Sequence, residues 1–322
     1  MFTGRIAAVT SAVLALAGCA LPSEKVAPGA YALISKEEAN CGFVIGREAI
    51  AVIDSRGSIS GAEGVLKTVR YVAGRNKPAG EGPEPVRYLI DTTFLGSHTF
   101  GNMVFRPPER WRKMPGWASA EIIATTKTRD LMETYGAQML QAYRRAGASD
   151  IEDVVVVSPT ITFEGSAFVH LGERRLRIIE TPGPSEGACA VWLEEDKVVF
   201  AGDALYVKEL PWLGTADLDA WRKSLEKLEG MNALVYVPGG GALGDKEDIA
   251  ALRRYLGDLE KEVHKAILSG MKPREAVEEI ELPAYRSWAK YRDRLPGNIL
   301  DMYRILEKRP PVPPFGEGRV EN

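Results

Sequence analysis

The stretch VRYLIDTTFLGSH, residues 86–98, decides how the rest of the chain is interpreted. Its first part, Val86–Ile90, is a short apolar run that predicts a buried strand, and the polar residues from Asp91 onward predict a loop. Polar groups that follow a buried strand gather at one edge of a sheet, where they can meet groups from neighbouring strands. The stretch ends in His98, one of three histidines in the chain.

Hairpins and helices flank this stretch on both sides. The expected strand hairpins lie at 42–55 and 188–201, further strands at 154–157, 160–163, 167–171, 174–180 and 234–237, and helices at 61–73, 119–145, 218–228 and 249–267. Hairpins come first, helices follow, and the pattern repeats. This order predicts an α+β domain in which two mixed sheets pack together with helices outside.

Composition narrows the classes of function. The chain has 322 residues, of which 45% are hydrophobic and 26% charged, as is ordinary for a soluble globular protein. The net charge is −3, which argues against generic nucleic-acid binding because that needs a basic face. Three cysteines and three histidines exclude a Cys-rich zinc module and a dense disulfide scaffold.

The first residues have the pattern of an export signal. One positive charge at Arg5 precedes the small, apolar run 6–18, which as a helix of about 20 Å is too short to span a bilayer. The end of this run, LAGC at 16–19, resembles the lipobox of bacterial lipoproteins. That resemblance implies a lipid on Cys19 and a protein anchored to the cell envelope, facing the periplasm or the exterior. The alternative is a signal peptide with an incidental cysteine.

The expected organisation is therefore a signal peptide at 1–18, a tether at 19–40, one domain at 41–308 and a disordered tail at 309–322. Export leaves Cys41 and Cys189 in an oxidising compartment. They either form a disulfide or remain two separate buried thiols, because a free cysteine packs like a small hydrophobic side chain.

Five short motifs resemble, in order, those of the metallo-β-lactamase fold superfamily, particularly its periplasmic, quinoprotein-associated members. The resemblance runs from about residue 40 to 270 and implies a four-layer αβ/βα sandwich. The motifs are VID at 52–54, YLIDT at 88–92, TPG at 181–183, FAGD at 200–203 and VPG at 237–239.

Active members of that family carry a His-x-His-x-Asp-His loop and further ligands that hold two metal ions and a bridging hydroxide, which is the nucleophile. In this chain His98 and Asp203 keep a ligand type, as vestiges of the metal site. The degenerate positions are Thr93, Leu95, Ser97, Pro184 and Gly240. A catalytic zinc normally has about three protein ligands, so the expectation is no cofactor, with zinc as the less favoured alternative.

Three interpretations of the pocket remain open. In the first, the scaffold is degenerate, and His98 and Asp203 are structural, bonded to each other or to backbone. In the second, a divergent enzyme uses His98 as general base oriented by Asp203 or Asp91, or holds one weak metal with Glu186 added. In the third, one loop is misaligned and a ligand has been missed.

The favoured function is a non-hydrolytic binding or accessory role for the old active-site cleft. The alternative is a metallo-hydrolase acting on an ester or thioester. The expected partners are the membrane through its lipid anchor, and a small molecule in the cleft or a periplasmic protein at the loop 106–117.

Overall fold

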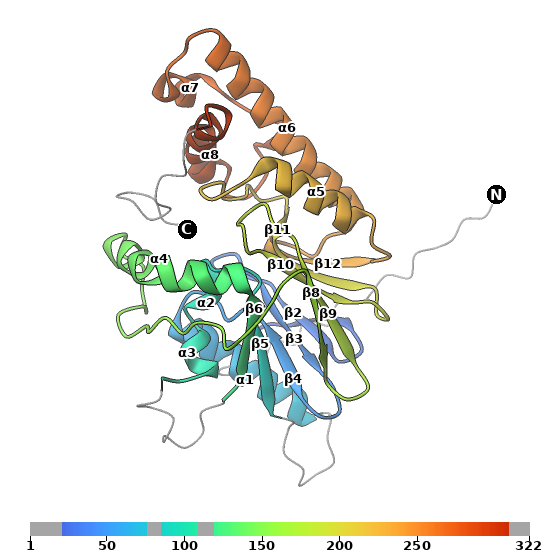
Figure 1. Cartoon of the computed structure of the whole chain (residues 1–322). Helices are drawn as coiled ribbons and strands as arrows, with labels where there is room; N and C mark the ends of the chain where they lie inside the picture. The colour runs from blue at the N-terminus through green and yellow to red at the C-terminus, as the bar shows by residue number, and fades with distance from the viewer. Residues whose placement is uncertain (1–20, 76–84, 109–118, 309–322) are drawn as a thin grey trace, which may run out of the picture.

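The computed structural model describes residues 21–75, 85–108 and 119–308. Two β-sheets lie face to face, with helices on the outer face of each (Figure 1). This arrangement confirms the expected α+β sandwich of two mixed sheets. The signal peptide, Cys19 and the tail at 309–322 lie outside the described residues.

The first sheet has seven strands in the order β1-β2-β3-β4-β5-β6-β7. Strands β1 to β4 pair antiparallel as hairpins, whereas β4, β5, β6 and β7 run parallel. The strand bounds are β1 Glu24–Ala27, β2 Ala30–Leu33, β3 Cys41–Ile45, β4 Ile50–Ile53, β5 Val86–Ile90, β6 Glu121–Thr125 and β7 Ile161–Phe163. The covering helices are α1 Ile59–Arg75, α2 Gly96–Thr99, α3 Asn102–Phe105 and α4 Thr126–Arg145.

The second sheet has five strands in the order β12-β11-β10-β9-β8. Its strands are β8 Ser166–His170, β9 Arg175–Glu180, β10 Cys189–Leu193, β11 Val198–Val207 and β12 Val235–Gly241. The helices after it are α5 Leu218–Glu229, α6 Lys246–Leu268, α7 Pro273–Glu279 and α8 Tyr291–Leu306, with a 3₁₀ turn at Pro283–Tyr285. Every residue of β11 is buried, because the first sheet lies on one face and α5 and α6 lie on the other.

The hydrophobic core forms three layers that match this architecture. One cluster, with Phe43 and Leu89, lies between the first sheet and its helices. A second, with Phe200 and Ile178, lies between the two sheets. The third lies between the second sheet and α5 to α8, and its largest member is Trp221, whose indole N–H donates to the Ala204 carbonyl at 2.9 Å. That bond ties α5 to the strand that carries Asp203.

Two sequence-based expectations are wrong. A loose tether was expected at 19–40, but residues 24–33 form β1 and β2, which extend the first sheet beside β3. A single helix was expected at 119–145, but 121–125 form β6 and the helix begins at Thr126, with Thr125 as its N-cap. The run Ile122–Ala124 is buried on both faces, so it carries no amphipathic period that would separate strand from helix.

Two further segments differ from the expectation or lie largely outside the described residues. Residues 154–157 run as an irregular segment rather than as a strand. Most of the loop 106–117 falls in the undescribed segment 109–118. Of the described helices, none is both long and apolar enough to cross a membrane.

Candidate functional site

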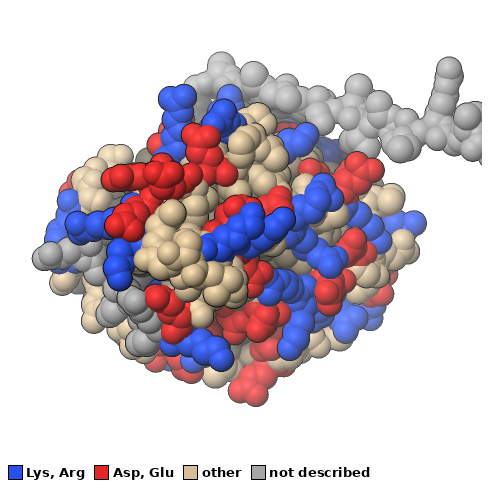
Figure 2. Space-filling model, turned by 90° about the horizontal axis from the view of Figure 1, so that it is seen from above, with Lys and Arg blue, Asp and Glu red and all other residues tan. Residues whose placement is uncertain are grey.

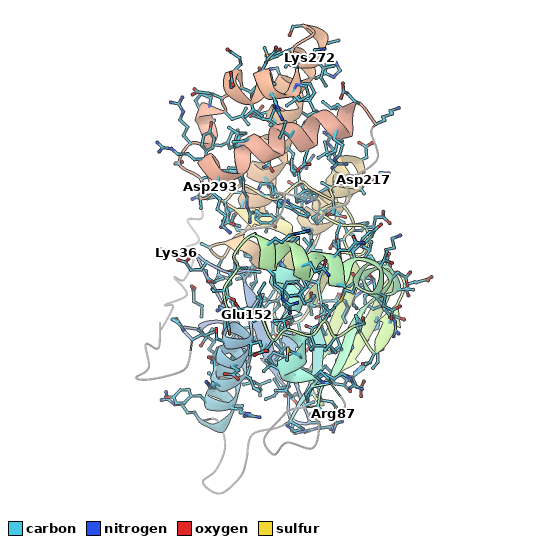
Figure 3. The ribbon with its side chains drawn as sticks, turned by 90° about the vertical axis from the view of Figure 1, so that its left-hand side faces the viewer. Lys36, Arg87, Glu152, Asp217, Lys272 and Asp293 are labelled. Carbon is cyan, nitrogen blue, oxygen red and sulfur yellow. The ribbon has the colours of Figure 1, made fainter. Side chains whose placement is uncertain are left out.

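A cleft of about 520 Å³ opens at the edge of the sandwich where β4, β5 and β11 end. Its lining comes from distant parts of the chain: the segments at 37–39, 56–61 and 148–151, the end of β11, and the start of α8. Lys36, Glu152 and Asp293, which adjoin three of these segments, are labelled in Figure 3 around the middle of the molecule. His98 and Asp203 both line the cleft, so the structure brings together the two residues that the sequence analysis singled out as candidate ligands.

His98 bridges two carboxylates. Its Nδ1 lies 2.9 Å from Oδ2 of Asp54, and its Nε2 lies 3.1 Å from Oδ1 of Asp203. The three side chains are 1–3% exposed. Asp54 follows β4 with a left-handed φ of 60°, which turns its side chain back toward the start of α2. The expected contact between His98 and Asp203 is therefore present, and Asp54 is an additional partner.

Electrostatics favour a charged imidazolium between these carboxylates. Burial lowers the pKa of His98, but Asp203 and Asp54 together raise it more, so that it lies well above its ordinary value. Burial raises the pKa of Asp203, but His98, Tyr206 and Arg294 outweigh it and hold that pKa below its usual range. Both shifts favour the charged imidazolium–carboxylate pair over the neutral pair. A histidine with both ring nitrogens engaged by carboxylates has no free nitrogen to accept a proton from a substrate.

A second charged group lies beside the first. Glu209 is buried, and its Oε1 lies 3.1 Å from Nζ of Lys290 and 3.7 Å from Nη1 of Arg294. Arg294 also donates to the Leu210 carbonyl at 2.7 Å. A Cβ at Gly240 would lie 2.7 Å from Oε1 of Glu209, so the Glu209 carboxylate occupies the space that a side chain at position 240 would need. The N-terminal end of α8 therefore supplies two cations to the part of the cleft that holds Glu209.

The other degenerate positions offer no ligand set. The hydroxyl of Thr93 lies 3.1 Å from that of Ser185, and Leu95 is buried in the core of the first sheet. Ser97 lines the cleft, whereas Pro184 is buried and has no donor atom. Among the described residues, no three His, Cys, Asp or Glu side chains are grouped so as to hold a metal ion. The residues present therefore do not fit the metal pair of active family members.

Asp91 and Glu186 do not join His98. Asp91 accepts a hydrogen bond from the Asn102 amide at 2.8 Å, and burial raises its pKa well above the ordinary value, with Asp54 adding to that rise. Glu186 is exposed and pairs with Lys127 at 2.6 Å. In the structure Asp91 and Glu186 therefore pair with Asn102 and Lys127, and neither carboxylate takes the place of Asp54 or Asp203 beside His98. His170 is exposed at the far end of β8.

Cys41 and Cys189 are separate, free and buried thiols. They lie on β3 and β10, in different layers of the core. Burial raises the pKa of both thiols, which makes them inert toward thiol chemistry.

Sequence reasoning missed four groups at this site: Tyr206, Glu209, Lys290 and Arg294. Tyr206 donates to Oδ1 of Asp203 at 2.7 Å. None of the four stands in a recognisable motif, and the two cations come from a helix that the sequence analysis did not predict. Lysine, arginine, aspartate and glutamate alternate over the face seen in Figure 2, so the described residues form no continuous basic surface there.

Comparison with known proteins shows which family model and which solved structures this chain resembles. Residues 96–240 match the family model described as the metallo-beta-lactamase superfamily. Solved structures with the same fold include a metallo-beta-lactamase family protein, TTHA1429 from Thermus thermophilus, with a TM-score of 0.61 and 18% identity over 88% of this chain and 95% of that one. The sec-alkylsulfatase Pisa1 from Pseudomonas sp. has a TM-score of 0.63 and 16% identity over 88% and 49% of the two chains.

Curated relatives are similar over shorter stretches. The hydroxyacylglutathione hydrolase of Mesorhizobium japonicum is 27% identical over 121 residues, which are 38% of this chain and 48% of that protein. The acyl-coenzyme A thioesterase MBLAC2 of Bos taurus is 29% identical over 76 residues, 23% and 27% of the two chains. The matched part thus spans half or less of these relatives. The chain thus has the metallo-β-lactamase fold, and its residues 96–240 match the model of that superfamily.

Proposed function

We propose that this protein is a lipid-anchored envelope protein whose cleft binds a small polar ligand without metal-dependent hydrolysis. One observation carries the proposal: the chain's own cations neutralise the carboxylates of the old metal region. His98 lies between Asp54 and Asp203, and Lys290 and Arg294 lie against Glu209. Where active relatives need metal ions to balance such buried charge, this network balances it internally.

The cleft has the size and polarity of a small-molecule site. Its volume of about 520 Å³ suits a ligand of metabolite size. Among the described residues, Oδ2 of Asp203 is buried without a hydrogen-bond partner and belongs to a side chain that lines the cleft. A ligand hydroxyl or ammonium group that donates to this oxygen would satisfy it. Serine hydroxyls at 58, 60, 97 and 149 provide further polar contacts.

A divergent hydrolase acting on an ester or thioester is the second candidate. The printed names of the curated relatives, a hydroxyacylglutathione hydrolase and an acyl-coenzyme A thioesterase, favour it. The geometry of His98 opposes it, because both ring nitrogens are engaged by carboxylates.

Metal content and turnover of one preparation distinguish the two candidates. The mature protein is purified without chelators, incubated with zinc or manganese, and analysed for bound metal and for hydrolysis of model esters and thioesters. We expect less than about one-tenth of an equivalent of metal, and no turnover above that of His98→Ala. Near-stoichiometric metal that Asp203→Ala removes, or turnover that His98→Ala abolishes and the exposed control His170→Ala retains, would overturn the proposal.

A further inference from the structure

The described chain begins at the wall of the cleft. Leu21 lines the cavity, and its backbone N–H donates to Oγ1 of Thr68 on α1 at 2.7 Å. Its side chain packs on the same helix, since a Cβ at Gly64 would lie 3.0 Å from Leu21 Cδ1. Because Gly64 and Thr68 are one turn apart, both contacts are made on one face of α1.

The sequence leaves little chain between this contact and the anchor. Cys19 precedes Leu21 by two residues, which span at most about 7 Å even when fully extended. The headgroup layer of a bilayer is about 5–7 Å deep on each side of the hydrocarbon core. We propose that the cleft rim at Leu21 faces the bilayer surface and docks against the lipid headgroups. This inference rests on the lipid at Cys19 that the proposed function includes.

The same helix carries residues suited to such a surface. Tyr71 lies about one turn beyond Thr68 and is 36% exposed, which places it among the exposed large apolar side chains of the described protein. Its hydroxyl accepts a hydrogen bond from Arg75 at 3.0 Å, and the guanidinium carbon lies 5.5 Å from the ring centroid. Tyrosine and arginine are residues that lie at headgroup level, because each joins an apolar body to a polar tip.

The rim of the cleft is polar rather than apolar. Ser60 and Ser149 are exposed at the mouth of the cleft, and the carboxylate of Asp150 accepts a hydrogen bond from the Ser60 N–H at 2.6 Å. Such a rim fits the hydrated headgroup layer and not the hydrocarbon core. A ligand that is itself a membrane amphiphile would reach the cleft without leaving the bilayer surface.

Quenching by labelled lipid tests this orientation on the full-length, lipidated protein. The chain is reconstituted into vesicles of phosphatidylethanolamine and phosphatidylglycerol that contain a nitroxide-headgroup lipid. A thiol-reactive fluorophore is attached to Ser149→Cys at the rim, just after α4, or to the matched control His170→Cys on β8, a strand that lies across the molecule from the free end of α4 (Figure 1). The native thiols of Cys41 and Cys189 are buried and leave the introduced cysteine as the site of labelling.

The expected result is loss of more than half of the emission at Ser149→Cys and little loss at His170→Cys. A Gly/Ser spacer of about 15 residues, inserted before Leu21, adds a mean reach of about 20 Å and should remove most of the quenching at Ser149→Cys. Equal quenching at the two positions, or quenching that the spacer leaves unchanged, would overturn the inference alone. Mass spectrometry of the N-terminal peptide without an acyl modification would overturn the proposed anchoring, and this inference with it.

Discussion

Replacing His98 with alanine tests whether the buried charge network stabilises the fold. The imidazole is 1% exposed and lies between the carboxylates of Asp54 and Asp203 at 2.9 and 3.1 Å. His98→Ala leaves these two carboxylates buried without the cation between them. Their remaining donors are the Thr92 backbone N–H and hydroxyl on Asp54 and the Tyr206 hydroxyl on Asp203.

The expected loss of unfolding free energy follows from the burial of both the imidazole and its carboxylate partners. Removing one member of a buried ion pair costs about 3–5 kcal/mol, because the other charge stays buried without compensation. We expect a loss in this same range for His98→Ala, since the remaining hydrogen bonds to both carboxylates keep the cost from doubling. Adding Asp203→Asn to His98→Ala should recover part of that loss, because it removes one of the uncompensated charges.

Urea unfolding of the mature domain measures this loss, and its pH dependence gives a second readout. The pKa of His98 is raised in the folded state, so its stabilisation is complete below the unfolded pKa of about 6.5 and declines as the pH rises toward the folded value. The difference in unfolding free energy between the wild type and His98→Ala should therefore be largest near pH 6 and shrink above it.

The exposed histidine of β8 provides the matched control. His170→Ala should change stability by no more than about 0.5 kcal/mol, as is usual at surface positions. The reasoning is refuted by a His98→Ala variant as stable as His170→Ala, or by a stability difference that grows with pH.

Three further outcomes are expected. Asp91→Asn should stabilise the domain at pH 7 by about 1.4 kcal/mol for each unit by which burial raises the pKa of that carboxyl, and urea unfolding at pH 4 should show the gain vanish. Gly239→Ala should cost about 1–3 kcal/mol by the same assay, because its Cβ would lie 2.3 Å from Oδ1 of Asp203, whereas the control Gly257→Ala meets nothing within 4 Å and should be neutral or stabilising. The cysteines of β3 and β10 should each titrate with a thiol reagent in denaturant without reductant and neither should react in the native state, whereas silence in denaturant would indicate a disulfide.

Local sequence predicted the elements whose pattern is self-contained. Strand β5 lies at Val86–Ile90 as predicted, because a short apolar run is bounded there by polar residues. The segment at 121–125 could not be assigned in the same way, since its apolar residues are consistent with either a strand or a helix until β5 and β7 are beside it. Strands β1 and β2 were missed because their short runs, at 24–27 and 30–33, are stabilised by pairing with each other and with β3.

The site residues, like the strands, divide into those that local sequence could predict and those that it could not. His98 and Asp203 were identified because each stands in a motif with a fixed order along the chain. Lys290 and Arg294 could not be found, because their role depends on where α8 packs: Arg294 bonds to the Leu210 carbonyl, 84 residues earlier in the sequence. Counter-charges from a distant helix leave no local signal in the sequence.

The first described residue and the last helix of the chain meet at the cleft, since Leu21 and Arg294 line the same cavity. During synthesis, nearly the whole protein is therefore made between these two lining residues. A nascent chain that stops before α8 would contain Glu209 without Lys290 and Arg294 and could not complete the pocket. The cleft is thus assembled only once the C-terminal helix docks, and its closure reports that the whole chain has folded.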